Sequence, residues 1–230
     1  MGIVPGNNRN RICIHGGRVI DPANAIDALQ DVYLADGRIV SLGNRPDGFE
    51  TDQEIDAGNC IVCPGLIDLG VRVREPGQEH KASIATESLA AASGGVTTLC
   101  CPPDTDPVTD TPAVAELVRL RAETAGKTRI VPLGALTRGL AGEQLSEMAA
   151  LARAGCAGVS NAMRPLVNTL VQRRALEYAA TFDLTVFLHA NDHALANKGC
   201  AHEGRVAARL GLPGIPEAAE TAAVARDLAL

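Results

Sequence analysis

Charged and polar residues follow four apolar runs of the sequence, and their side chains are of the types used in catalysis and ligand binding. Arg72 and Arg74 follow the first run and Asp104 follows the second. Asn161 and His189 mark the ends of two later runs. A guanidinium binds carboxylates and phosphates through paired hydrogen bonds, and an imidazole transfers protons or binds a metal ion. The pattern therefore indicates an anion site or a metal site.

Arg72 and Arg74 are two residues apart, a spacing that points both side chains to the same face of an extended strand. Together they would form an anion-binding pair. The alternative, which we favour, is that Arg72 forms an ion pair with a nearby carboxylate, Asp68 or Asp104, because buried charges need partners.

His189 and His193 are four residues apart, the spacing that places two imidazoles on one face of a helix. A metal site of this kind needs a third ligand, and none with a matching spacing is evident. The pair His202-Glu203 is not followed by the second histidine of an HExxH motif. The histidines alone therefore do not define a metal site.

The chain has seven cysteines, an odd number that cannot pair completely within it. Cys60 and Cys63 form a C-x-x-C, and Cys100 and Cys101 are adjacent, so a metal site is one interpretation. We favour reduced thiols packed in the core, because most of the cysteines lie in apolar, strand-like runs. Structural zinc sites usually draw on two such pairs held on turns.

Residues 1–63 are predicted to form a small β structure. Within it, Asp36-Gly37 separates two runs in which apolar residues alternate, VYLA and RIVSL. Such a pair between alternating runs is a strong signal for a two-residue hairpin turn. From residue 64 the pattern changes, and strands alternate with amphipathic helices.

Residues 64–230 are predicted to contain five units of one strand and one helix. The expected strands are 65–69, 96–101, 129–134, 156–160 and 184–189, and the expected helices are 84–94, 111–126, 143–155, 168–182 and 217–230. This alternation predicts a parallel sheet with right-handed crossovers. A (β/α)8 barrel is preferred to an open doubly wound sheet, because the first strand leads into RVREPG and not into a glycine-rich phosphate turn. Active sites of such barrels lie at the carboxyl ends of the strands.

Charge and hydropathy exclude several classes of protein. A net charge of −6 and a charged fraction of 21% argue against a nucleic-acid surface and against disorder. No apolar run reaches the roughly 18–20 residues of a membrane-spanning helix. The start, MGIVPGNNRNR, has no apolar region typical of a secretion signal. We expect a cytoplasmic protein that binds neither nucleic acid nor membrane.

The segment PGLIDLGVRVREPG (64–77) resembles the dihydroorotases, the cyclic-amidohydrolase branch of the amidohydrolase superfamily, whose pattern here is close to PGLIDLHVHLREPG. The resemblance covers nearly all of the chain, through three further stretches at 87–111, 174–196 and 202–230. It implies an amidohydrolase-type (β/α)8 barrel with a small β-sandwich formed around the N-terminal segment. It also implies zinc-dependent, reversible cyclisation of carbamoyl aspartate to dihydroorotate.

Most positions that would bind zinc in the family carry other residues here. Gly70 and Arg72 stand where the family has His-x-His, and Asn161 and Ala162 stand at the acidic positions that supply its bridging carboxylate. Glycine has no ligand atom, and a guanidinium has only donors. At ~4 Å and an effective dielectric of about 20, Arg72 would repel each unit of metal charge by about 4 kcal/mol. Of the ligand positions within this chain, only His189 is retained.

The residues implied to contact substrate are partly kept. Arg74 in REPG matches the family's arginine that pairs with the substrate carboxylate. Asp104 in PPDT replaces an asparagine and would repel a dianionic substrate. We therefore interpret two residues as relicts of a substrate site, Arg74 and Asp104, and the degenerate metal site as Gly70, Arg72 and Asn161 with the relict ligand His189.

The resulting expectation is a dihydroorotase-like pseudoenzyme with no catalytic residue and no cofactor. The resemblance implies a non-catalytic structural or regulatory partner of the catalytic chain of aspartate transcarbamoylase in pyrimidine biosynthesis. The alternative is an active, zinc-dependent dihydroorotase. Because the chain stops at Leu230 after the fifth unit, we expect a barrel truncated after about five βα units. Its exposed strand edge would favour association, including a homo-oligomer.

Overall fold

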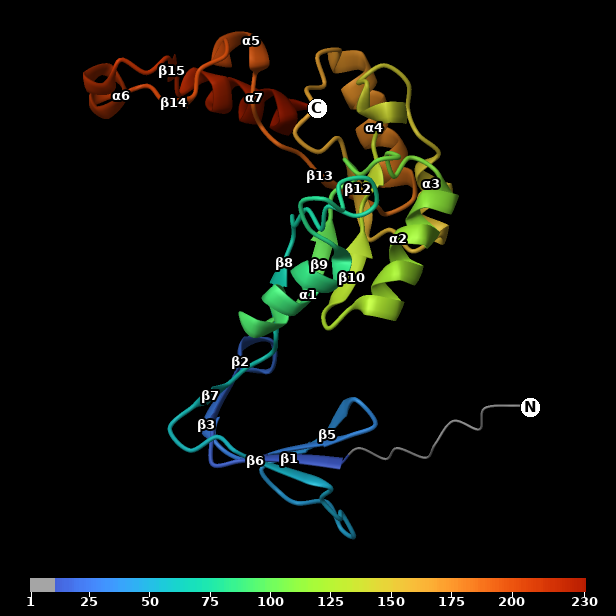
Figure 1. Ribbon diagram of the computed structural model, residues 1–230, viewed down its shortest axis with the longest axis vertical. Coiled ribbons are helices and arrows are strands. Elements are labelled where there is room, and N and C mark those ends of the chain that lie inside the picture. Colours follow the sequence, from blue (N-terminus) through green and yellow to red (C-terminus); the bar gives the residue numbers. More distant parts are fainter. Residues whose placement is uncertain (1–10) are drawn as a thin grey trace. The chain divides into compact units, whose positions relative to one another are not determined.

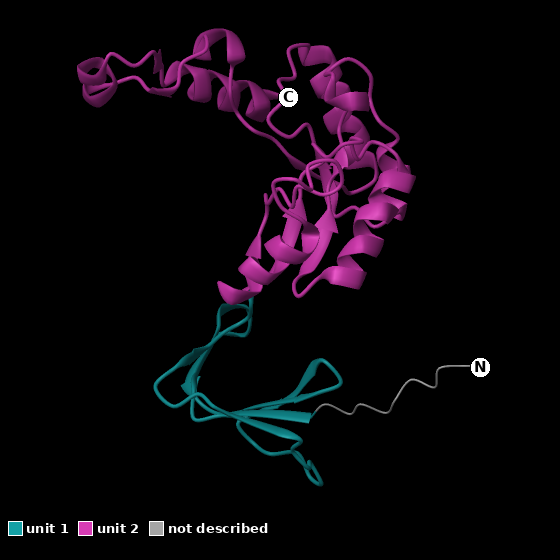
Figure 2. Cartoon of the chain, viewed as in Figure 1, with its two compact units in different colours: residues 1–65 teal, residues 66–230 magenta. Residues whose placement is uncertain are grey.

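A computed structural model describes residues 11–230 of the chain (Figure 1). The chain divides into two compact units, residues 1–65 and residues 66–230 (Figure 2). The segment MGIVPGNNRN, on which the expectation about a secretion signal rests, lies outside the described residues. Within residues 11–230, no helix combines the length and the apolar character needed to cross a membrane.

The first unit contains two small β-sheets, with the strand orders β5-β4-β1-β6 and β3-β2-β7. The strands are β1 (Arg11–His15), β2 (Arg18–Asp21), β3 (Ile26–Leu29), β4 (Val32–Ala35), β5 (Arg38–Leu42), β6 (Gln53–Asp56) and β7 (Ile61–Val62), with the 3-10 turn η1 (Pro22–Asn24) after β2. The predicted hairpin is confirmed, since β4 and β5 pair antiparallel around Asp36-Gly37. These two residues have φ of 52° and 74°, the left-handed backbone that this turn requires.

A small aromatic core supports the four-stranded sheet. Tyr33 and Phe49 meet edge to face with their ring centroids 5.4 Å apart. Cys13 is buried beside them, and the guanidinium of Arg11 lies 5.6 Å from the centroid of the Phe49 ring. Two of the chain's five aromatic residues are therefore used in this core.

The second unit carries parallel strands that are neighbours in space in the order of the chain. β8 (Leu66–Asp68) pairs with β9 (Val96–Cys101), which pairs with β10 (Arg129–Pro132). β11 (Gly134–Ala135) follows β10 after one residue and pairs with β12 (Gly158–Ser160), which pairs with β13 (Thr185–Phe187). The predicted parallel pairing is confirmed. These strands do not show the reversal of order that defines a doubly wound sheet.

Local sequence signals explain where the helices of this unit begin. α1 (Ile84–Ser93) starts behind Ser83, which exchanges hydrogen bonds with Thr86 in a capping box. α2 (Pro112–Ala125) has proline at its first position, where no N–H is needed. The side chain of Asn168 accepts two backbone N–H bonds at the start of α4 (Thr169–Thr181), and α7 (Ala218–Ala229) closes the chain.

Several predicted elements are wrong in extent, most of all the helix over 143–155 and the strand over 184–189, and others were not predicted. The helix expected over 143–155 is only α3 (Met148–Arg153), because Leu145 forms a β-bridge with Thr137 around the 3-10 turn η2 (Arg138–Leu140). The strand expected over 184–189 ends at Phe187. The elements between β13 and α7 that were not predicted are α5 (His193–Ala196), β14 (Ala201–His202), α6 (Arg205–Leu210) and β15 (Gly214–Ile215).

Aliphatic side chains of modest size pack between the sheet and its helices. One buried cluster lies beneath α1 and α2 and contains Val73, Ile84, Leu99, Cys101, Ala122 and Ile130. A second lies between β12 and the helices α3 and α4 and contains Leu136, Met148, Val159, Leu166, Ala175 and Ala179. Alanines on the helix faces allow a close approach to the sheet, so the unit packs with few aromatic residues.

The predicted packing of the cysteines is right for four of them and wrong for three. The buried thiols are Cys13, Cys100, Cys101 and Cys156. Burial raises the pKa of Cys101 to about 11 and that of Cys156 to about 12. The exposed thiols are Cys60, Cys63 and Cys200. Cys60 and Cys63 are exposed because they flank β7, a two-residue strand at the edge of its sheet.

Candidate functional site

An ion pair joins the segments that follow β8 and β9. Nε of Arg72 donates to Oδ2 of Asp104 over 2.6 Å, and the two side chains are only 32% and 27% exposed. The interpretation favoured for Arg72 is confirmed, with Asp104 as its partner. Asp68, the other candidate, accepts a hydrogen bond from the N–H of Gly70 over 3.0 Å instead.

Arg74 lies outside any strand. β8 ends at Asp68, and Arg74 has a φ of 63°, in the left-handed region that residues other than glycine seldom occupy. The expectation that Arg72 and Arg74 alternate along one strand face is therefore wrong, because the chain has already left the sheet.

Arg74 and Lys81 share one neutral acceptor. Nη1 of Arg74 donates to Oε1 of Gln78 over 3.3 Å, and Nζ of Lys81 donates to the same oxygen over 3.2 Å. Among residues 11–230, neither cation has a salt bridge to a carboxylate. Two cations around one amide oxygen suit an anionic ligand. Sequence reasoning missed Gln78 and Lys81, since only the turn at Gly77 returns them to Arg74.

Asn161 ties two loops together. It is 3% exposed, its Oδ1 accepts from the hydroxyl of Thr137 over 2.7 Å, and its Nδ2 donates to the carbonyl of Arg164 over 3.2 Å. Oγ1 of Thr137 in turn accepts from the N–H of Gly142 over 3.0 Å. Both polar atoms of the amide are engaged, and the linked loops follow the neighbouring strands β11 and β12. Thr137 was missed because nothing in the sequence relates it to Asn161.

Gly70 adds no functional group to the site, although there is room for one. A Cβ atom placed on it would meet nothing within 4 Å. A side chain at this position would therefore not be crowded.

His189 lies two residues beyond the end of β13. His193 is the first residue of α5, which Asp192 caps, so the two histidines do not share a helix face. Within residues 11–230, no group of three or more His, Cys, Asp and Glu side chains is placed to hold a metal ion. His189 lines two pockets, and one of them also includes Asn161, Gln172, Asn191 and Asp227.

The structure places the predicted residues in two groups. Arg72, Arg74 and Asp104 line one pocket, whereas Asn161 and His189 line another. The zinc centre implied by the resemblance does not fit these side chains. Its ligand positions hold a glycine, a guanidinium already paired with a carboxylate, and an amide whose two polar atoms are engaged.

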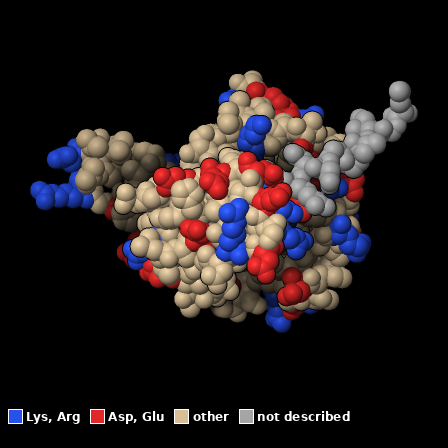
Figure 3. Space-filling view, turned by 90° about the horizontal axis from the view of Figure 1, so that it is seen from below, with Lys and Arg blue, Asp and Glu red and all other residues tan. Residues whose placement is uncertain are grey.

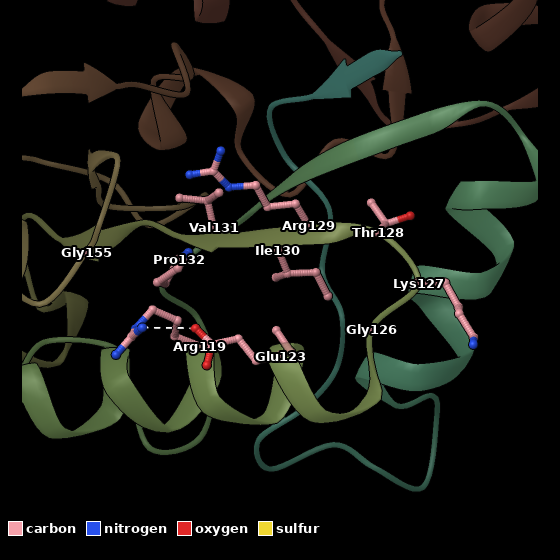
Figure 4. Close-up of a pocket in the computed structure, with 11 residues that line it drawn as sticks. Arg119, Glu123, Gly126, Lys127, Thr128, Arg129, Ile130, Val131, Pro132 and Gly155 are labelled. Carbon is pink, nitrogen blue, oxygen red and sulfur yellow. Dashed lines mark hydrogen bonds and ion pairs between the residues drawn. The ribbon is translucent and has the colours of Figure 1, made fainter. Parts of the chain in front are cut away.

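A separate pocket of about 460 Å³ lies between α2 and β10 (Figure 4). Its lining comes from α2, the turn at Gly126, β10 and Gly155, and none of the predicted site residues takes part. Arg119 and Glu123 form an ion pair along α2 in this pocket, with Nη1 and Oε1 2.9 Å apart. This pair gives each charge a local partner.

Charges of both signs are mixed on the face of the molecule drawn in Figure 3. Lysine and arginine side chains lie between aspartate and glutamate side chains, with uncharged surface around them.

Solved structures define the class of fold to which the chain belongs. The L-hydantoinase (dihydropyrimidinase) of Arthrobacter aurescens matches with a TM-score of 0.77 and 20% identity, over 95% of this chain and 49% of that one. A D-hydantoinase matches with a TM-score of 0.66 and 21% identity, again over 95% and 49% of the two chains. At these identities the similarity shows the fold alone, an α/β fold that the chain shares with these hydantoinases.

Sequence comparison then identifies the family. The dihydro-orotase-like family model matches residues 58–230, and the chain belongs to this family. A dihydroorotase-like protein of Pseudomonas putida is 52% identical over 219 residues, which are 95% of this chain and 52% of that protein. A dihydroorotase of Anaeromyxobacter sp. (strain K) is 46% identical over 217 residues, 94% of this chain and 50% of that protein. The chain spans about half the length of these curated relatives.

Proposed function

We propose that this protein is a dihydroorotase-like pseudoenzyme, which has lost the metal centre and does not cyclise carbamoyl aspartate. The ion pair of Arg72 with Asp104 carries the proposal. It occupies the strand ends with two fixed charges that neutralise each other, and the guanidinium offers only donors to its surroundings. A dication at this place would be repelled by Arg72 and would have to compete with it for Asp104.

Asn161 supports the same proposal. An amide has no negative charge with which to hold two dications together. Its oxygen already accepts from Thr137, and turning it towards a metal ion would leave that buried hydroxyl without an acceptor. Such a loss costs about 1–3 kcal/mol. His189 would remain as a single retained ligand position within this chain.

The finer architecture belongs to the proposal as well. Residues 64–230 form about five units of an eight-unit barrel, and residues 1–63 form part of a β-sandwich. The sequential order of the parallel strands supports this arrangement. So does the edge strand β8, whose Leu66 and Ile67 are 57% and 63% exposed. Apolar side chains on an open strand edge are typical of a surface that a further segment or another chain covers.

The proposal includes a structural or regulatory role in pyrimidine biosynthesis, which the family resemblance implies. In this role the protein assembles with the catalytic chain of aspartate transcarbamoylase, and self-association is a second mode. The family resemblance is the basis for naming this partner.

A retained anion site is a second component of the function, and Arg74 is the observation that favours it. Its guanidinium and the Lys81 ammonium both depend on the neutral oxygen of Gln78. A small carboxylate between them would give both cations a charged acceptor, which forms stronger hydrogen bonds than an amide does. Binding without turnover would suit a regulatory subunit.

The alternative function is that of an active, zinc-dependent dihydroorotase. Relatives at 46% identity are named dihydroorotase. Metal analysis of the purified protein, combined with a dihydroorotate hydrolysis assay, distinguishes the two. We expect neither stoichiometric zinc nor zinc-dependent turnover. Finding both would refute the proposed loss of function. The triple substitution Gly70→His, Arg72→His and Asn161→Asp then tests whether restoring three positions is enough.

The proposed partnership has its own test. Co-expression with aspartate transcarbamoylase should yield a complex that survives purification. The transcarbamoylase made without this protein should be incompletely assembled or less active. A transcarbamoylase that is fully assembled and active in its absence would contradict the partnership, whatever the outcome of the zinc analysis.

A further inference from the structure

A carboxylate connects the loop after β8 to two helices. Glu75 follows Arg74 directly, and its side chain is 17% exposed. Its Oε2 accepts the N–H of Ile84, the first residue of α1, over 2.9 Å. Its Oε1 accepts from Nη1 of Arg121 on α2, also over 2.9 Å. The start of a helix has unpaired N–H groups and a positive end of its dipole, so Glu75 anchors the loop at a favourable place.

The same guanidinium reaches the far end of the loop. Both carboxylate oxygens of Glu79 accept the N–H of Gly77 at 3.0 Å, and its Oε1 lies 3.4 Å from Nη1 of Arg121. Gly77 packs so closely on Asp106 that a Cβ atom would collide with it. Residues 75–79 are therefore held against α2 and against the loop that carries Asp104.

Arg74 stands directly before these contacts, with its backbone in the left-handed region. A non-glycine residue keeps such a conformation only when the surrounding structure imposes it. We propose that Glu75 and Arg121 are positioning residues, whose ion pair at the start of α1 holds the backbone of Arg74 and so directs its guanidinium to the anion site beside Gln78 and Lys81.

This inference rests on the retained anion site proposed above and names the residues that build it. Neither Glu75 nor Arg121 donates to the anion. Their effect is on the fraction of molecules in which Arg74 is already placed for binding. When that fraction falls, the apparent affinity falls in proportion.

Succinate is the probe, and two measurements on the full chain are needed. Calorimetry measures its affinity, and hydrogen exchange with mass spectrometry measures the rigidity of residues 74–81. Arg121→Met removes the guanidinium that contacts Glu75 and Glu79. We expect roughly tenfold weaker binding and faster exchange in the loop. Arg121→Lys, which keeps the charge, should recover part of both.

Glu75→Gln keeps an oxygen that can accept from Ile84 but loses the charge that pairs with Arg121. We expect changes in the same direction as for Arg121→Met. The double variant Glu75→Gln with Arg121→Met should be no weaker in binding than Arg121→Met alone, because both substitutions remove one interaction.

Arg119→Met is the matched control. Arg119 lies on the same helix, and its Nη1 also pairs with a glutamate Oε1 at 2.9 Å, that of Glu123. That pair lies within α2 and does not involve residues 74–81. Neither the affinity for succinate nor the exchange of the loop should change.

Two results would overturn the roles of Glu75 and Arg121. One is binding and exchange in Arg121→Met equal to those of the unsubstituted protein. The other is faster exchange with unchanged affinity, which would make the pair structural only. A third result has a different meaning: if the unsubstituted protein does not bind succinate, or if Arg74→Met binds it equally well, the anion site itself is refuted and the inference falls with it.

Discussion

Breaking the ion pair of Arg72 with Asp104 should destabilise the second unit. The atoms meet at 2.6 Å between side chains that are 32% and 27% exposed. Charges about 4 Å apart attract by about 4 kcal/mol at an effective dielectric of 20, and desolvation of both groups offsets much of this. We expect Arg72→Met and Asp104→Asn each to lower the free energy of unfolding by about 1–3 kcal/mol, because each leaves one partner unpaired. The coupling energy between them should be about 1–2 kcal/mol.

Urea unfolding followed by far-ultraviolet circular dichroism measures these energies. The signal is suited to the second unit, because the α-helices of residues 11–230 all lie within it. The ion pair of Arg119 with Glu123 is the control, since its atoms are 2.9 Å apart but its side chains are 52% and 59% exposed. Its coupling energy should be about 0.3–0.5 kcal/mol. A coupling at Arg72–Asp104 no larger than this would refute the reasoning that partial burial strengthens the pair.

Three further predictions concern other parts of the chain. Asn161→Asp should lower the free energy of unfolding by about 2–4 kcal/mol in the same urea assay. The substitution buries a charge and removes the hydrogen bond to the Arg164 carbonyl. An unchanged free energy of unfolding would contradict the role of the amide. In the native protein, a thiol reagent should modify three cysteines quickly, and mass spectrometry should identify them as the exposed Cys60, Cys63 and Cys200. Burial raises the pKa of Cys156 to about 12, so rapid labelling of Cys156 would count against the packing described. The N–H of Gly77, then the N–H of Glu79 itself and then the contact with Arg121 lower the pKa of Glu79 below its ordinary 4.5. Its stabilisation of the loop is therefore complete above pH 4.5 and is lost as the pH falls through the lower folded value. The protection factors of residues 75–79, which correct the exchange rate for the intrinsic effect of pH, should fall over this acid range, and unchanged protection would contradict the assignment.

Short-range signals made much of the fold predictable. The Asp36-Gly37 turn and the proline at the first position of α2 act within a few residues of themselves, so their effects can be read directly from the chain. The prediction fails between residues 143 and 147, where Leu145 pairs with Thr137 and the helix starts later. That pairing depends on two separate segments, and helical periodicity alone does not contain it.

By itself the sequence determined which functional groups are present at the strand ends. Gly70 cannot bind a metal, Arg72 cannot lose its charge, and Asn161 has no charge to offer, and each of these facts follows from covalent structure. The tertiary structure decided how these groups are used. It paired Arg72 with Asp104 instead of Asp68, gave Asn161 its partner Thr137, and placed Arg74 in left-handed backbone beyond the end of β8. Such choices depend on distances between segments far apart in the chain, and packing sets those distances only when the strands and loops come together.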